Sequence, residues 1–153
     1  MSDFPGRLLG IDYGLRVLGL ALSDPSGTLA RPLQVLVRRS KREDFAHIDA
    51  LLAEHEAVGC VVGLPTSPPQ VTEYTQADRV RLWASRLAAT VRAPVYLWDE
   101  RYSTQDAAEL LHEAGRPIPQ RMDAVAAAVI LQSFLEALRE GLPWPERVLP
   151  AEE

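Results

Sequence analysis

The spacing of apolar residues changes once along the chain, near residue 42, and this change constrains the fold more than any other feature. Before it, the segments 7–12, 17–24 and 29–38 are extended and apolar, with a polar turn, PSGT, before the third. Within the second segment Leu18, Leu20 and Leu22 alternate with small residues, a period of two that predicts a strand. After the change, helical spacing predicts helices at 43–55, around 80–91 and at 122–140, and a further helix that begins at Ser103 or Thr104. Apolar runs between them predict strands at 58–64 and 94–98.

This order of elements predicts an α/β fold. Three consecutive strands joined by tight turns form an antiparallel meander, whereas strands that alternate with helices pair in parallel. We therefore expect a mixed five-stranded sheet, antiparallel on one side and parallel on the other, with helices on both faces. A length of 153 residues suits one domain, which we place at 1–140. The proline-rich acidic tail, 141–153, is expected to be an arm or a frayed end.

Composition excludes several classes of protein. No apolar run approaches the roughly 18 residues that a membrane span needs, and the first residues lack a secretory signal, so we expect a cytoplasmic protein. Cys60 is the only cysteine and lies within VGCVVG, which predicts a buried thiol and excludes a cysteine zinc cage. The net charge of −5 does not exclude a nucleic-acid partner, because net charge says little about local sites.

Three acids are the candidate catalytic residues. Asp12 ends the first strand in GIDYG, Glu100 follows the strand PVYLW, and Asp123 begins the last helix. Ligands of such sheets bind outside the carboxyl ends of the parallel strands, so these side chains can meet at one edge. Carboxylate oxygens are the ligands that Mg²⁺ prefers, and one or two such ions activate water for phosphodiester hydrolysis. The pattern predicts a nuclease that uses Mg²⁺ or Mn²⁺.

Each acid has a simpler explanation when it is taken alone. Asp12 suits a turn beside glycines, Glu100 suits an ion pair with Arg101, and Asp123 suits a helix N-cap. The agreement of three placements favours a shared site. Together the carboxylates would repel one another, which makes such a cluster costly without cations.

Several motifs resemble a known family over about residues 7–138. They are GIDYGLRVLGLALSD, GLP at 63–65, DERYST at 99–104 and DAVAAAVILQSFL at 123–135. This set resembles the YqgF family, also called RuvX, which groups RNase H-like nucleases related to Holliday junction resolvases. The resemblance implies an RNase H-like fold with Asp12, Glu100 and Asp123 as the metal-binding catalytic acids. It also implies maturation of the 5′ end of pre-16S ribosomal RNA, or resolution of four-way DNA junctions.

Basic residues near these motifs are candidates for substrate binding. Arg16 and Arg101 flank two of the acids and could hold a phosphate, or neutralise the carboxylates in the empty enzyme. The run RRSKR, with Arg38, Arg39, Lys41 and Arg42, could guide a nucleic-acid backbone, or form an ordinary solvated loop. Tyr13 suits base stacking or aromatic packing. Gly19 suits a close approach of backbone or plain packing.

Two other classes of protein remain as alternatives. A catalytically silent nucleic-acid-binding or scaffold protein could keep the same fold. A phosphotransferase of the actin and sugar-kinase type also opens with a DxG hairpin, but it needs two such domains, and no GxxxxGK[ST] motif occurs here. Among nucleases, a junction resolvase should be a homodimer with two-fold symmetry, whereas an RNA-trimming enzyme can act as a monomer. The segment PWP at 143–145 is a candidate dimer contact.

Overall fold

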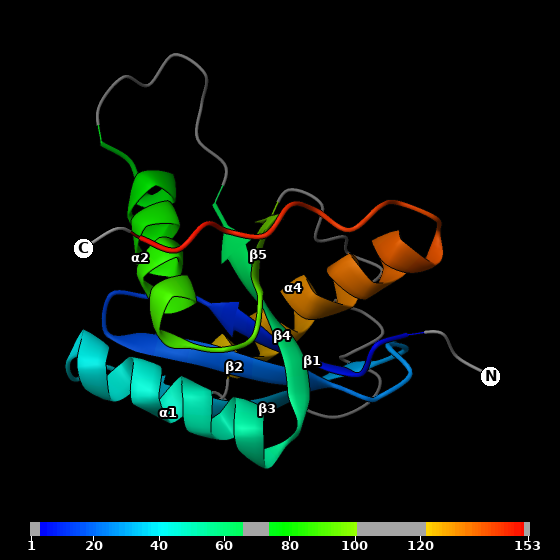
Figure 1. Ribbon diagram of the computed structural model, residues 1–153, viewed down its shortest axis with the longest axis horizontal. Helices are drawn as coiled ribbons and strands as arrows, with labels where there is room; N and C mark the ends of the chain where they lie inside the picture. The colour runs from blue at the N-terminus through cyan, green and yellow to red at the C-terminus, as the bar shows by residue number, and fades with distance from the viewer. Residues whose placement is uncertain (1–3, 66–73, 101–121, 152–153) are drawn as a thin grey trace.

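The computed structural model describes residues 4–65, 74–100 and 122–151 and contains a five-stranded sheet (Figure 1). The strands lie in the order β3-β2-β1-β4-β5. Their bounds are β1 (Arg7–Asp12), β2 (Val17–Ser23), β3 (Ala30–Val37), β4 (Ala57–Leu64) and β5 (Val95–Asp99). The first three pair antiparallel, and β4 pairs in parallel with both β1 and β5. The predicted mixed sheet is confirmed.

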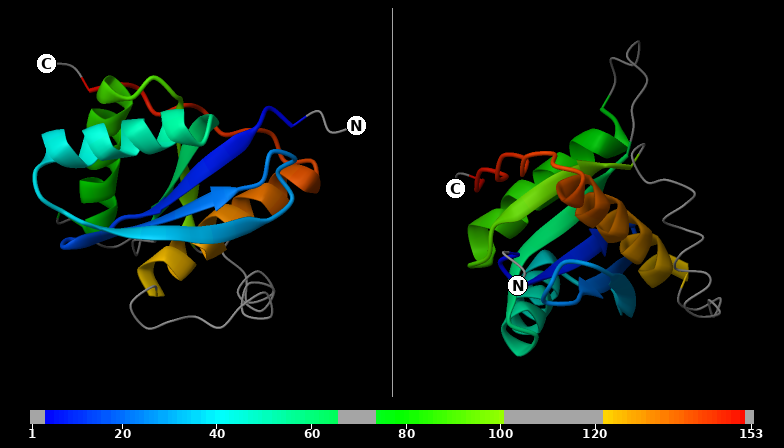
Figure 2. Two further views of the ribbon diagram at one scale, coloured as in Figure 1. Left: turned by 90° about the horizontal axis from the view of Figure 1, so that it is seen from below. Right: turned by 90° about the vertical axis from the view of Figure 1, so that its right-hand side faces the viewer.

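Helices cover both faces of this sheet, as predicted. Helices α1 (Lys41–Glu54) and α2 (Gln76–Thr90) pack on one face, and α4 (Met122–Arg139) packs on the other (Figure 2). The helix predicted to open at Ser103 or Thr104 lies outside the described residues. The alternation of side chains along the strands divides the core into two parts, so that Leu9 packs with α1 and α2 while Leu8 packs with α4.

Local capping fixes where α1 and α2 begin. The Ser40 hydroxyl accepts a hydrogen bond from the Glu43 amide (3.1 Å), which satisfies one free N–H of the first turn of α1. Thr75 and Asp78 form a reciprocal capping box at the start of α2, with hydrogen bonds of 2.9 and 3.2 Å. Strand β3 points in the same direction as β1, because both pair antiparallel with β2. Three residues separate the end of β3 from α1, so α1 begins at the end of the sheet where β1 also ends.

Cys60 confirms the prediction of a buried thiol. Its side chain is fully buried on β4, and burial, aided by the negative charge of Asp49, raises the pKa of this thiol to about 12. A thiol with so high a pKa stays protonated at neutral pH and is a poor nucleophile.

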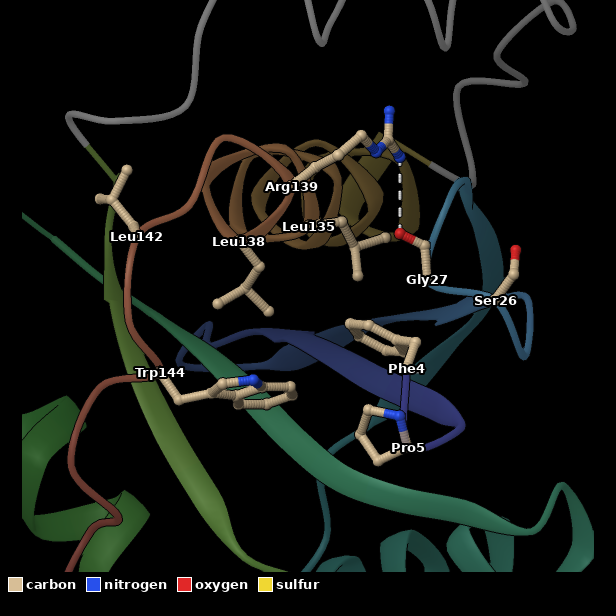
Figure 3. A pocket seen from close by; sticks show the side chains of 9 residues that line it. All are labelled: Phe4, Pro5, Ser26, Gly27, Leu135, Leu138, Arg139, Leu142 and Trp144. Carbon is tan, nitrogen blue, oxygen red and sulfur yellow. Dashed lines mark hydrogen bonds between the residues drawn. The ribbon is translucent and has the colours of Figure 1, made fainter. Parts of the chain in front are cut away.

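The described part of the tail forms an arm that packs against the domain. The Val148 amide donates to the Val95 carbonyl (2.7 Å), and the Ala151 amide donates to the Ser85 carbonyl (2.9 Å). The arm therefore partly covers the free edge of β5 (Figure 1, red). Trp144 contacts Phe4 and lines a cavity of about 330 Å³ beside the end of α4 (Figure 3).

No helix within the described residues combines the length and the apolar composition that crossing a membrane requires.

Candidate active site

Asp12 lies at the centre of the candidate site. It ends β1 and pairs with Gly19 of β2, and its carboxyl group is half-buried. Burial first, and then the negative charges of Glu100 and Asp123, raise the pKa of Asp12 to about 6. The folded chain therefore brings the three predicted acids within electrostatic reach of one another, although more than 80 residues separate Asp12 from Glu100.

Asp123 reaches this edge because α4 packs directly on β2. The residue lies in the first turn of the helix, and its backbone sits against Gly19. A Cβ at position 19 would overlap the Asp123 carbonyl oxygen, so only glycine allows this approach. Gly19 thus serves helix packing, and through it the placement of Asp123 beside the strand pair that ends in Asp12.

Glu100 directly follows β5 and is half-buried. Burial, together with the negative charge of Asp99, raises its pKa. A Cβ on Gly63 of β4 would lie 3.1 Å from Glu100 Oε1 and 2.5 Å from Ile130 Cδ1 of α4. The absence of a side chain at position 63 therefore leaves room for the glutamate next to the helix.

The chemistry of this set suits a hard divalent cation. The three acids offer only oxygen ligands, and within the described residues none of them forms an ion pair with a basic side chain. Their mutual repulsion, and the raised pKa values of Asp12 and Glu100, are what a bound cation would relieve. As the side chains stand, no three His, Cys, Asp or Glu residues of the described segments are close enough to hold one ion, so binding would have to draw these carboxylates together.

The basic residues predicted around the acids do not form one patch. Arg16 is exposed on the β1–β2 connection, and its carbonyl accepts a hydrogen bond from the Arg38 amide (2.9 Å). Arg101 lies outside the described residues. Arg39 is exposed beside Glu43, at 3.9 Å, and Arg42 is exposed on α1. Of the run RRSKR, only Arg38 and Lys41 line a cavity described below.

Arg38 is held by three contacts close to Asp12. Its Nη1 donates to the Gly14 carbonyl (2.9 Å), and its Nε lies 3.7 Å from the buried carboxylate of Asp44. Its guanidinium lies over the Tyr13 ring, 4.8 Å from the centroid. Tyr13 also meets Trp83 edge-on at 5.3 Å, so the structure places Tyr13 in aromatic packing.

The structure adds basic residues that the sequence interpretation missed. A cavity of about 160 Å³, here called the α1–α2 cleft, combines cationic and aromatic side chains. Its lining residues are Tyr13, Arg38, Lys41, Tyr74, Arg79, Leu82, Trp83 and Arg86. Arg79, Leu82 and Arg86 follow the three- and four-residue spacing of one helix face, and this spacing is visible in the sequence. The sequence alone did not show that this face lies beside Lys41 and Tyr13.

Comparison with known proteins gives a uniform result. The RuvX family model, described as Holliday junction resolvase, matches residues 6–137. A relative from Anaeromyxobacter sp. (strain Fw109-5) is 44% identical over 133 residues, covering 85% of this chain and 96% of the relative. One from Koribacter versatilis (strain Ellin345) is 38% identical over 144 residues and covers 92% of both chains. Both are named as candidate nucleases of pre-16S rRNA.

Solved structures of junction resolvases share the fold. T. thermophilus RuvC in complex with a Holliday junction substrate superposes with a TM-score of 0.64 at 19% identity, covering 92% of this chain and 99% of that one. The yeast mitochondrial Holliday junction resolvase gives 0.51 at 12% identity, covering 92% and 83%. These similarities confirm the predicted RNase H-like fold.

Proposed function

The chain is a member of the RuvX family, and from this membership and the acidic edge of its sheet we propose that it is a divalent-metal-dependent nuclease. The reaction is hydrolysis of phosphodiester bonds in structured nucleic acid. Asp12, Glu100 and Asp123 are proposed as both the metal ligands and the catalytic residues.

One observation supports this assignment above all others. The pKa of Asp12 is raised to about 6 by burial and by the charges of Glu100 and Asp123, which come from different elements of the fold. A half-buried acid surrounded by like charges destabilises the cation-free protein, and perturbed acids of this kind cluster at functional sites. A purely structural role would pair such an acid with a basic side chain, and none of the described residues supplies one.

Each of the three acids would supply carboxylate oxygens as ligands of the cation. Asp12 is fixed by its strand, Asp123 by the packing of α4 on Gly19, and Glu100 by the space beside Gly63. Bound Mg²⁺ or Mn²⁺ supplies activation of water and neutralisation of the charge that develops on the phosphate. One or two ions fit this proposal. Position 126, three residues after Asp123 in α4, is alanine and adds no further carboxylate, which favours weak binding of a second ion.

We place the precursor of 16S ribosomal RNA first among substrates. The relatives named for it are 33–44% identical over most of the chain. The second candidate is the four-way DNA junction, which the family description and the fold of RuvC favour. A junction resolvase needs two active sites related by two-fold symmetry, so a monomer in solution would favour the RNA substrate.

The decisive experiment compares cleavage of three substrates by the purified full chain in Mn²⁺: pre-16S RNA, single-stranded DNA and a four-way junction. We expect cleavage that EDTA abolishes, and a large loss of kcat in Asp12→Asn, Glu100→Gln and Asp123→Asn. Glu54→Gln is the matched control, because this exposed carboxylate ends α1 at the opposite edge of the sheet. Full activity in an acid variant would remove that residue from the catalytic set.

The same panel tests the alternative of a silent nucleic-acid-binding or scaffold protein. Such a protein would bind one of the substrates but would leave all three intact in Mg²⁺ and in Mn²⁺. Sizing of the protein in solution, run in parallel, distinguishes a monomer from a homodimer.

A further inference from the structure

The α1–α2 cleft lies at the end of β1 that carries Asp12, on the face of the sheet that α1 and α2 cover, and its charge is opposite to that of the acids. It is lined by four cationic side chains, from Arg38, Lys41, Arg79 and Arg86, and by no carboxylate of the described residues. Tyr13, which directly follows Asp12 in the chain, forms part of its wall. Within the described residues these basic side chains form no ion pair with the three acids, so neutralisation of the acidic site does not explain their presence.

Three of the four cations are available to a ligand. Lys41, Arg79 and Arg86 are exposed, and no carboxylate of the described residues lies within ion-pair distance of them. Arg38 is different, because Asp44, the Gly14 carbonyl and the Tyr13 ring already hold it. Arg38 therefore shapes the wall, and the other three supply positive charge that no carboxylate of the described residues neutralises.

The wall of the cleft is held by packed side chains. Trp83 is 2% exposed and meets both Tyr13 and Phe45 edge-on, at 5.3 and 5.5 Å between ring centroids. The indole N–H of Trp83 has no acceptor within the described residues. Arg38 links the start of α1 to the backbone just after Asp12. The side chains that form the wall of the cleft therefore also fix the segment that directly follows β1.

The size of the cleft limits what it can hold. A volume of about 160 Å³ is well below the roughly 300–1,000 Å³ of pockets that enclose a small-molecule ligand. It suits a phosphate group that enters from a strand lying across the opening. Tyr74, with 63% of its surface exposed, lines the opening and offers a ring on which a base can stack.

We propose that the α1–α2 cleft is a binding site for the strand that flanks the scissile bond, with a phosphate held by Lys41, Arg79 and Arg86 and a neighbouring base stacked on Tyr74. The nature of the ligand rests on the proposed nuclease function. The role is one of binding and positioning, since none of these residues belongs to the acidic set. Stacking tolerates any base, so the cleft holds a flanking strand without reading its sequence.

The test measures binding separately from cleavage. Binding of single-stranded RNA and DNA oligonucleotides is titrated in EDTA at several salt concentrations, for the wild type and for Arg79→Gln/Arg86→Gln. If the contact with this one phosphate is lost, the slope of log K against log salt should flatten by about 0.7, the value for one phosphate of a single strand. The matched control, Arg31→Gln/Arg92→Gln, removes the same charge from exposed positions at the opposite edge of the sheet and should leave the slope unchanged.

Tyr74 gives an independent test of stacking. Tyr74→Leu should weaken binding by about fivefold or more, from a stacking contribution of roughly 1–3 kcal/mol per base, and Tyr74→Trp should restore it. The residue is exposed, so both variants should unfold at the temperature of the wild type. Equal affinity of the leucine and tryptophan variants would overturn the stacking assignment.

Kinetics separate this proposal from the proposed function. Cleft variants should raise KM and leave kcat nearly unchanged, whereas Asp12→Asn should lower kcat. Metal-dependent cleavage together with unchanged binding by the cleft variants would overturn the cleft alone. Cleft-dependent binding without any cleavage would overturn the nuclease and keep the cleft. An absence of nucleic-acid binding in the wild type would overturn both.

Discussion

Replacing Asp12 by asparagine should stabilise the cation-free protein at neutral pH while removing its activity. The carboxyl group has an ordinary pKa of 3.8, which burial and the charges of Glu100 and Asp123 raise to about 6 in the folded protein. Ionising Asp12 is therefore harder in the folded state than in the unfolded state. An amide of nearly the same shape has no charge to desolvate, so the variant avoids this cost.

The size of the effect and its pH range follow from the two pKa values. Below pH 3.8 Asp12 is protonated in both states, and the substitution should have no electrostatic effect. Between pH 3.8 and about 6 the folded state keeps a proton that the unfolded state has lost, so the wild type becomes less stable as the pH rises. The full difference corresponds to about 3 kcal/mol at about 1.4 kcal/mol per pKa unit. Asp12 is partly exposed, so screening by solvent reduces our expectation to about 1–2 kcal/mol.

Urea unfolding in EDTA between pH 4 and pH 8 measures this difference. We expect the free energy of unfolding of Asp12→Asn to exceed that of the wild type by about 1–2 kcal/mol at pH 7.5, and the gain to vanish near pH 4. A gain that does not change with pH, or a loss of stability at pH 7.5, would refute the reasoning.

Asp24→Asn serves as a control of opposite sign. Burial acts to raise the pKa of Asp24, but hydrogen bonds from Leu29, Ser26 and Thr28 outweigh it and lower the pKa to about 2. The ionised carboxylate therefore stabilises the turn above pH 3.8, and this contribution is lost as the pH falls through about 2. The asparagine variant should be less stable than the wild type throughout the range from pH 5 to pH 8.

Three further predictions concern the same elements. Thermal unfolding of the wild type at pH 7.5 should shift upward with added Mn²⁺, as for any ligand that binds only the folded state, and the shift should shrink strongly in Asp12→Asn. Gly19→Ala should displace the first turn of α4 and lower kcat severely, with a loss of about 1–3 kcal/mol in urea unfolding, because its Cβ overlaps the Asp123 carbonyl. Gln132→Leu should lower the free energy of unfolding by about 1–3 kcal/mol in the same assay, without loss of kcat in the folded fraction. The buried Ala30 amide donates a hydrogen bond to Gln132 Oε1 (2.8 Å), and the leucine would leave this amide without an acceptor.

The sequence predicted the sheet because its signals are local. Alternation in β2, the apolar run of β4 and the helical spacing of α1 are each properties of a few consecutive residues, and burial enforces them. The order of the elements then left few ways to pair the strands, since βαβ connections produce parallel neighbours. The role of residues 141–151 was harder to predict, because two backbone hydrogen bonds to β5 and α2 hold the arm, and such bonds leave no pattern in the side chains.

The candidate site was predictable only where a motif marks it. Asp12, Glu100 and Asp123 stand at the ends of recognisable elements, so topology alone places them near one edge. The distances between the three carboxylates depend on the position of α4 over the sheet. That position depends on Gly19, because only glycine lets the helix backbone come so close. The sequence assigned this glycine equally to packing or to a close backbone approach. The α1–α2 cleft was not predicted, because three of its four cations come from two helices, and no local sequence pattern encodes the distance between those helices.

The close packing of α4 links the stability of this protein to its chemistry. Like charges gathered without a cation repel, so the fold must hold the acids by interactions that do not depend on the charge. Helix α4 supplies them, with Ala124, Ala127 and Ala128 fully buried on the face that meets the sheet. Small residues on the helix and glycines on the strands let the two backbones approach, so dispersion contacts act over a large area. Because that approach also sets the position of Asp123, a substitution that enlarges this contact should disturb the acidic site even when the rest of the core tolerates it.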